Sequence, residues 1–185
     1  MSLAELIRRS RTFGALIGLE DLDLEGNQLY SFPSMVVKEL TRLARLNLAN
    51  NVITRFPDIG CLVELVDLSL ENNQLTTLPH GLANCSNLKY LNISKNRISD
   101  ISQIGNLLKL SELNLGYNNI MGLPDGIGNC YELRRLLGPY NKISDIPSTV
   151  WKCKMVHFSF HFSPSTSFRS LFFDFPSNVV GGAGL

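Results

Sequence analysis

Apolar and polar positions in this chain follow an eleven-residue pattern that occurs six times. The segments begin at Leu19, Leu43, Leu65, Leu88, Leu110 and Leu133, at intervals of 24, 22, 23, 22 and 23 residues. Each reads L-x-x-L-x-L-x-x-N-x-L, with Ile at some apolar positions, except that the sixth has Gly138 at its third apolar position. Another apolar residue follows three positions later, usually before a proline, as in Leu123-Pro124. A fixed period of this length is typical of a solenoid.

The centre of each segment predicts a short β-strand. Alternate side chains of a strand face opposite ways, so Leu113 and Leu115 are expected to point inward and Asn114 outward. One such strand cannot bury its leucines alone. Stacking of successive segments would form a parallel sheet on one side of a coil, and the stretch after each proline would cross the far side and close the core.

The asparagine at position nine of each segment lies among core positions, where a polar side chain needs a reason. The chain must turn after each strand, and this leaves backbone N–H and C=O groups unpaired inside the coil. An amide carries both donors and an acceptor, so these residues are expected to form a ladder between coils. The ladder residues are Asn27, Asn51, Asn73, Asn96, Asn118 and Asn141.

With these six in-phase copies, residues 19–155 resemble the leucine-rich repeat family. The resemblance implies an α/β fold: a curved, right-handed leucine-rich repeat solenoid with a parallel sheet on its concave face and short helical or irregular segments on its convex face. The endings LPHGL and LPDGI are similar to those of the intracellular Ras-associated class. The repeat ISDISQIGNLLKL, which lacks the proline, resembles those of the protein phosphatase 1 regulatory subunit.

The two ends of the chain depart from the pattern. Residues 1–18 are expected to form an N-terminal capping helix, because Ser2 and Glu5 have the spacing of a capping box. Residues 156–185 are expected to form a degenerate last coil and a disordered Phe-rich tail: Phe158 and Phe160 fit inner strand positions, but Ser163 replaces the ladder asparagine. The alternative is that the whole stretch is an unrelated tail.

Composition and charge exclude several classes of partner and location. Seventeen basic and sixteen acidic residues give a net charge of +1, which does not favour nucleic acid. No signal peptide and no membrane span is expected. Three of the four cysteines, Cys85, Cys130 and Cys153, share a column with leucines, so we expect core thiols in a reducing compartment and predict a cytoplasmic protein.

Catalytic motifs are not evident. The chain has no P-loop, GxSxG or HExxH motif, and no acidic pair stands out for acid–base work. Cys153, His157 and His161 have a spacing that would gather metal ligands on a helix, but the alternation of HFSFHF favours a strand, on which they lie too far apart. We therefore expect no enzyme activity, no cofactor and no metal.

The outward positions of the strands and turns predict a binding surface. The first coil is acidic and the later coils are aromatic and basic, and Tyr and Arg are frequent binding anchors. The residues expected to bind are Tyr90, Lys95, Tyr117, Tyr140, Arg135, Asp21, Asp23 and Glu25. Ordinary variation of solvated positions is the alternative interpretation.

The functional hypothesis is a non-enzymatic protein–protein interaction module. The resemblance implies an intracellular signalling scaffold or regulatory subunit, and a small GTPase or phosphatase as the partner on the concave face. Two alternatives stay open: the repeat fragment of a larger enzyme, such as a kinase, GTPase or ubiquitin ligase, and a structural component. The oligomeric state is not predicted.

Overall fold

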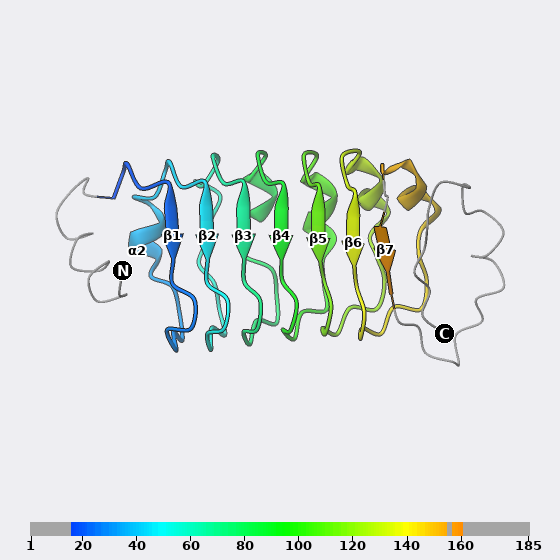
Figure 1. Ribbon diagram of the computed structural model, residues 1–185, viewed down its shortest axis with the longest axis horizontal. Coiled ribbons are helices and arrows are strands. Elements are labelled where there is room, and N and C mark those ends of the chain that lie inside the picture. The colour runs from blue at the N-terminus through cyan, green and yellow to red at the C-terminus, as the bar shows by residue number, and fades with distance from the viewer. Residues whose placement is uncertain (1–15, 155–156, 161–185) are drawn as a thin grey trace.

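The computed structural model describes residues 16–154 and 157–160. The predicted capping helix and the Phe-rich tail fall almost entirely outside these residues. Within them, the chain winds as a row of coils whose strands form one open, parallel, seven-stranded sheet in the order of the sequence (Figure 1). The strands are β1 (Asp21–Asp23), β2 (Arg45–Asn47), β3 (Asp67–Ser69), β4 (Tyr90–Asn92), β5 (Glu112–Asn114), β6 (Arg135–Leu137) and β7 (His157–Ser159).

The register of the sheet is that of the sequence pattern. The second leucine of each segment pairs with the second leucine of the next, as Leu91 does with Leu113. These middle residues are buried, whereas their neighbours on either side are exposed or half-buried. Each strand spans only three residues, because the chain turns once the second inward side chain has joined the core.

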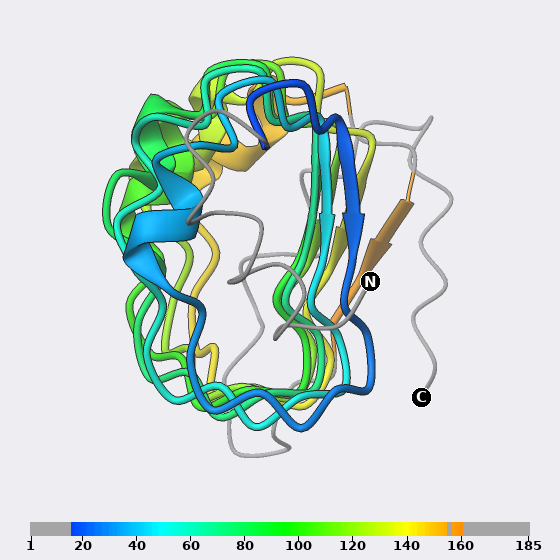
Figure 2. The ribbon, with the colours of Figure 1, turned by 90° about the vertical axis from the view of Figure 1, so that its left-hand side faces the viewer.

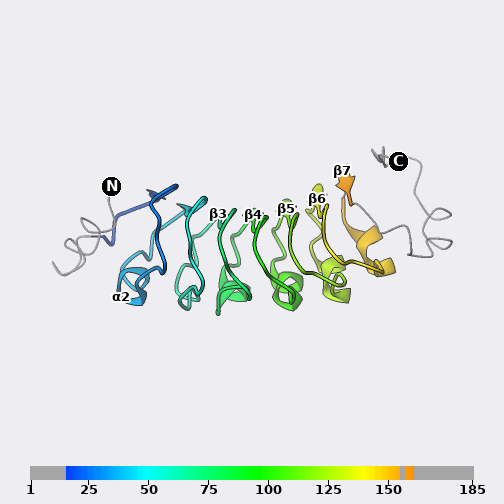
Figure 3. The ribbon, with the colours of Figure 1, turned by 90° about the horizontal axis from the view of Figure 1, so that it is seen from below.

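The side opposite the sheet consists of short helical turns (Figures 2 and 3). They are the single α-helical turn α2 (Ser34–Val37) and the 3-10 helices η1 (Leu82–Asn84), η2 (Ser102–Asn106), η3 (Asp125–Asn129) and η4 (Ser148–Lys152). In Figure 3 these turns fan out more widely than the strands, so the sheet lines the concave side. A 3-10 turn takes less room around its axis than an α-helix and fits a coil this short.

Neighbouring turns on the convex side approach closely. A Cβ on Gly105 would lie 2.8 Å from the Cα of Gly126 in the next coil, closer than side-chain carbons normally come. A Cβ on Gly128 would similarly meet Thr149. The glycines in GIGN therefore serve backbone packing between coils, and this accounts for GxG in this segment without a nucleotide site.

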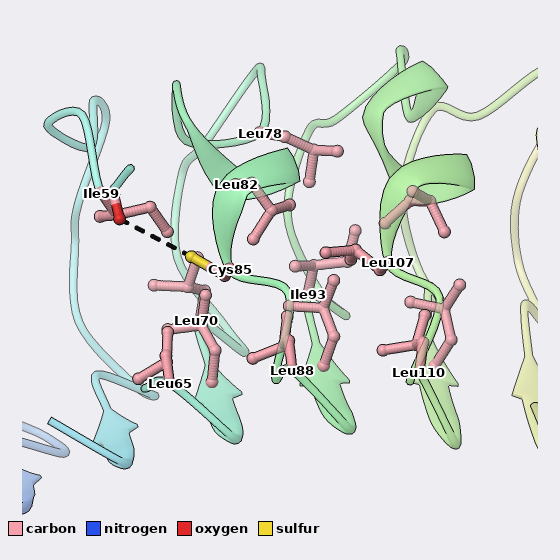
Figure 4. Close-up of a cluster of buried hydrophobic side chains, with 14 of the residues drawn as sticks. Ile59, Leu65, Leu70, Leu78, Leu82, Cys85, Leu88, Ile93, Leu107 and Leu110 are labelled. Atoms are coloured by element: carbon pink, nitrogen blue, oxygen red, sulfur yellow. Dashed lines mark hydrogen bonds between the residues drawn. The ribbon is translucent and has the colours of Figure 1, made fainter. Parts of the chain in front are cut away.

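The cysteines take part in the same stacking. Cys85 lies among leucines of the core, and its Sγ donates to the carbonyl oxygen of Ile59 in the preceding coil at 3.6 Å (Figure 4). Cys130 and Cys153 donate in the same way over 3.4 and 3.3 Å. Burial raises the pKa of Cys85 and Cys153 to about 11 and that of Cys130 to about 12. The three thiols therefore stay protonated at neutral pH, as packing groups do.

The asparagines of the ladder connect each turn with the preceding coil. The Nδ2 of Asn118 donates to the carbonyl oxygens of Ile93 and Leu115, both at 2.9 Å, and its Oδ1 accepts from the N–H of Ile98 at 2.9 Å. The same arrangement recurs at Asn51, Asn73, Asn96 and Asn141.

The first rung differs from the others. Asn27 is exposed, and its Nδ2 donates to the carbonyl oxygen of Glu25 in its own turn. Its turn is nevertheless tied to the next coil, because the backbone N–H of Asn27 donates to Oδ1 of Asn51 at 3.0 Å. The backbone of Asn27 thus donates to the ladder, whereas its side chain does not extend the ladder.

The seventh strand explains why Gly138 replaces a leucine. Phe158 on β7 pairs with Leu136 and is buried, so β7 continues the sheet although its sequence is divergent. A Cβ on Gly138 would overlap the ring of Phe160, which occupies the equivalent inner position of the next coil. A large side chain in one coil thus fills the space left by a missing side chain in its neighbour.

The ladder geometry yields a prediction for Asn118→Ala. The variant leaves the carbonyl of Ile93 and the N–H of Ile98 without their buried partner, so we expect the free energy of unfolding to fall by about 1–3 kcal/mol. Urea denaturation measures this value. Asn27→Ala is the control, because it removes an exposed rung; an equal loss in both variants would contradict the burial argument.

The Gly138–Phe160 contact yields a second prediction. Gly138→Ala forces the ring of Phe160 to move, and overpacking of this kind costs about 1–3 kcal/mol. In a double-mutant cycle with Phe160→Ala, the loss caused by Gly138→Ala should largely disappear, because the ring that it meets is gone. Additive losses in the cycle would show that the two positions do not interact.

Candidate functional site: the concave face

The concave face consists of side chains that point away from the core on the strands and the turns that follow them. Four columns run across the coils, each with one residue per coil. Two columns lie on the strands and begin at Asp21 and Asp23; two lie on the following turn and begin at Glu25 and Gly26. All eight predicted partner-binding residues belong to these columns.

Most charges on this face are paired with the neighbouring coil. Both Nε and Nη2 of Arg45 contact the carboxylate of Asp21, with Nη2 at 2.7 Å. Lys95 lies 2.8 Å from Glu71 on the preceding coil. Arg135 lies 3.2 Å from Glu112. The predicted division into an acidic first coil and basic later coils is therefore much weaker than the sequence indicated.

The pairing also raises the pKa of two bases, Arg45 and Lys95. The hydrogen bond that Arg45 donates to Asp21 raises the pKa of Arg45, and the bond that Lys95 donates to Glu71 raises the pKa of Lys95. Glu25 is bound by amides, accepting from Asn47 at 3.0 Å and from Asn50 at 2.7 Å. The predicted basic residues of the later coils are thus already engaged by carboxylates of this chain.

Several outward asparagines hold the turn, which sequence reasoning missed. The Oδ1 of Asn114 accepts from the N–H of Gly116 at 3.1 Å, two residues on. Asp23, Asn47 and Asn92 make the same bond to Glu25, Ala49 and Ser94. The signal was present in the sequence as an Asp or Asn recurring in one column, because these side chains favour such turns. Asn114 therefore serves the turn besides facing outward.

Tyr117 and Tyr140 form a stacked pair on adjacent turns. Their ring centroids lie 4.4 Å apart with an interplanar angle of 17°, and the residues are 49% and 55% exposed. Desolvation and the adjacent Tyr140 raise the pKa of Tyr117, while Lys95 on the preceding turn acts against this shift. Lys95, Tyr117 and Tyr140 are consecutive members of one column. The two tyrosines form its aromatic end.

The third predicted tyrosine lies elsewhere on the face. Tyr90 is on β4 and lines a shallow hollow together with Asp67, Glu112 and Arg135. A second hollow lies over β1, β2 and β3 and is lined by Asp21, Asp23 and Glu25 among others. The structure thus brings Tyr117 and Tyr140 together, and places Tyr90 and Arg135 in one hollow and the predicted acidic residues in another.

Other candidate chemistry does not assemble. His157 is exposed on β7, as the strand interpretation predicted, while Cys153 is half-buried against Ile127; His161 lies outside the described residues. In the described part of the chain, no three His, Cys, Asp or Glu residues gather in a way that could hold a metal ion. Nor does any helix within residues 16–154 and 157–160 have the length and apolar character needed to cross a membrane.

Known structures share this architecture. A leucine-rich repeat protein from Leptospira interrogans superposes with a TM-score of 0.73 and 30% identity, over 83% of this chain and 46% of that protein. An internalin from Listeria monocytogenes gives 0.68 and 28%, over 81% and 44%. A TDR receptor gives 0.70 and 26%, over 81% and 28%. This chain spans less than half the length of each.

A comparison with the curated proteins found no match. The family model described as leucine rich repeat matches residues 17–75 and 63–120. These two matches overlap and together cover more than half of the 185-residue chain. They include the first four repeats, the parallel sheet of those repeats and most of the asparagine ladder. The chain therefore belongs to the leucine-rich repeat family.

Proposed function

We propose that this chain is a non-enzymatic module that binds a partner protein on its concave face, anchored by Tyr117 and Tyr140. Leucine-rich repeats are associated with protein interaction, and this supports the general class of function. The specific anchor is supported by one observation: two bulky aromatic residues occupy a backbone conformation that does not suit them.

Tyr117 and Tyr140 have φ angles of 57° and 56°. Residues at the same turn position in earlier coils have similar angles: Asn50 and Asn72 are asparagines, which tolerate this left-handed region, and Lys95 has a φ of 55° and is paired with Glu71. A bulky side chain there costs about 1–2 kcal/mol per residue. The turn itself is served better by Asn, so the tyrosines need another explanation.

Their stacking returns only part of that cost, because an aromatic pair contributes about 0.5–1.5 kcal/mol beyond its buried area. What the stack provides is a rigid, half-exposed aromatic surface at the end of β5 and β6. Tyrosine is enriched among residues that contribute most to binding, since it buries a large area and loses few rotamers. Strain kept at a surface position is typical of sites that serve function.

The finer identity of the partner follows from the resemblance alone. Similarity to Ras-associated and phosphatase-regulating repeats supports a small GTPase or a phosphatase as partner, and the role of a signalling scaffold or regulatory subunit. A cytoplasmic location is supported by the four free cysteines. The neighbouring structures are each more than twice the length that this chain matches, and this favours a second candidate, the binding region of a longer protein.

A stability measurement tests the strain argument. The double variant Tyr117→Asn/Tyr140→Asn relieves two unfavourable backbone conformations and loses one aromatic stack. It can also recreate the hydrogen bond from Asn72 Nδ2 to Asn50 Oδ1, which is 2.8 Å long in the earlier coils. We expect the free energy of unfolding to stay the same or to rise by about 1 kcal/mol in urea denaturation. A loss of similar size would show that the tyrosines serve folding.

A binding measurement tests the proposed function. The full chain and the same double variant are immobilised, and proteins captured from a cell extract are compared by quantitative mass spectrometry. We expect specific partners to be lost from the variant while its fold is retained. Tyr131→Asn is the matched control, because Tyr131 is 54% exposed and lies outside the concave columns. If the captured proteins were the same for all three baits, the anchor assignment would be wrong.

A further inference from the structure

The column at the start of the strands alternates in charge until it reaches β4. Its members are Asp21, Arg45, Asp67, Tyr90, Glu112, Arg135 and, on β7, His157. Acidic and basic residues on adjacent strands pair on both sides of β3 and β4, Arg45 with Asp21 and Arg135 with Glu112. Tyr90 stands in the middle, where the alternation calls for a base.

Asp67 is the residue left without a partner by this interruption. The guanidinium of Arg45 on one side is engaged by Asp21, and Tyr90 lies on the other side. Among residues 16–154 and 157–160, no ion pair and no side-chain hydrogen bond reaches the Asp67 carboxylate. Partial burial raises its pKa, Glu112 acts in the same direction, and Arg45 opposes them. The folded chain therefore disfavours the charged form of the Asp67 carboxylate.

The four columns as a whole carry an excess of negative charge. Six acidic residues, Asp21, Asp23, Glu25, Asp67, Glu71 and Glu112, stand against three basic residues, Arg45, Lys95 and Arg135. The complete chain, by contrast, has a net charge of +1. All three bases are already paired. What the face offers to a partner is aromatic surface and unneutralised carboxylate.

We propose that the partner inserts an arginine or lysine side chain into the hollow over β3–β6, beside the unpaired carboxylate of Asp67 and across the ring of Tyr90. This inference rests on the proposed function and specifies the chemistry of the partner. Asp67, Tyr90 and Glu112 line the hollow together with Arg135, which is paired with Glu112, so Asp67 is the carboxylate left for a partner's base; Tyr90 is 43% exposed. A cation placed over the ring gains a cation–π interaction and completes the interrupted series of charges.

The spacing within one coil defines the partner segment further. Glu112 beside the hollow and Tyr117 in the stack are five residues apart on the same coil, a path of at most about 16 Å in extended chain. An extended segment that runs along this coil would therefore carry its base no more than about five residues from an aromatic or aliphatic side chain. That apolar side chain would pack on Tyr117 and Tyr140.

A peptide selection tests this inference. A random dodecapeptide library displayed on phage is panned on the full chain, enriched peptides are synthesised, and their dissociation constants are measured by fluorescence anisotropy. We expect the enriched peptides to combine a base with an apolar residue. Replacement of the base, for example arginine by the neutral isostere citrulline, should weaken binding about tenfold. Asp67→Asn should weaken the parent peptide equally and abolish the difference between the two peptides.

The variants separate this inference from the proposed function. Asp67→Asn keeps the shape of the side chain, and loss of a charge held at a cost should not unfold the chain. Glu64→Gln is the charge-matched control, because Glu64 is exposed outside the concave columns. Peptides that need Tyr117 and Tyr140 but bind Asp67→Asn as well as the parent would overturn the cation inference alone. The cation inference would also be overturned if the peptides bound the Asp67 and tyrosine variants as well as the parent chain, or if panning on the parent chain enriched no peptides relative to panning on Asp67→Asn. Equal binding to the tyrosine variant would in addition count against Tyr117 and Tyr140 as the anchor.

Discussion

The structure depends on pairing of the backbone groups where each coil turns inside the core. Three-residue strands leave the turn without a long ladder of their own, and water does not reach it. The amide of Asn118 solves this by accepting from one backbone group in the preceding coil and donating to carbonyls of two coils. Because each amide needs the coil before it, the repeats stabilise one another as neighbours and form one array.

The residues that form the coil are therefore different from the residues on its outer surface. The leucines and ladder asparagines fix where each outward position lies, so the outward side chains can vary without loss of the coil. They are nevertheless not all free, since Asn114 caps its turn and the three bases of the face are paired. With these engaged groups set aside, the proposed recognition of a partner rests on Tyr90, Asp67 and the Tyr117–Tyr140 stack.

Sequence reasoning reached the sheet, its register and the inward asparagines, because a period-two strand inside a 22–24-residue repeat permits few arrangements. It did not reach features that depend on contact between coils. The contact between the ring of Phe160 and Gly138 joins two repeats that both depart from the consensus. The departure in either repeat can be understood only when the other is placed beside it. The pairing of Arg45 with Asp21 and the stacking of Tyr117 on Tyr140 require side-chain positions across neighbouring strands. Column order predicts that such residues are neighbours, but not which of them bind each other.

The proposed function requires that a partner protein sits on the concave face against the tyrosine stack. Site-specific photocrosslinking tests it most directly, with p-benzoylphenylalanine placed at Tyr117 in one sample and at Leu108 in another. Leu108 is 57% exposed and lies outside the concave columns, between η2 and β5. We expect illumination to join the partner to the chain from position 117 and not from position 108. Crosslinking from position 108 alone would contradict it and would place the binding surface elsewhere.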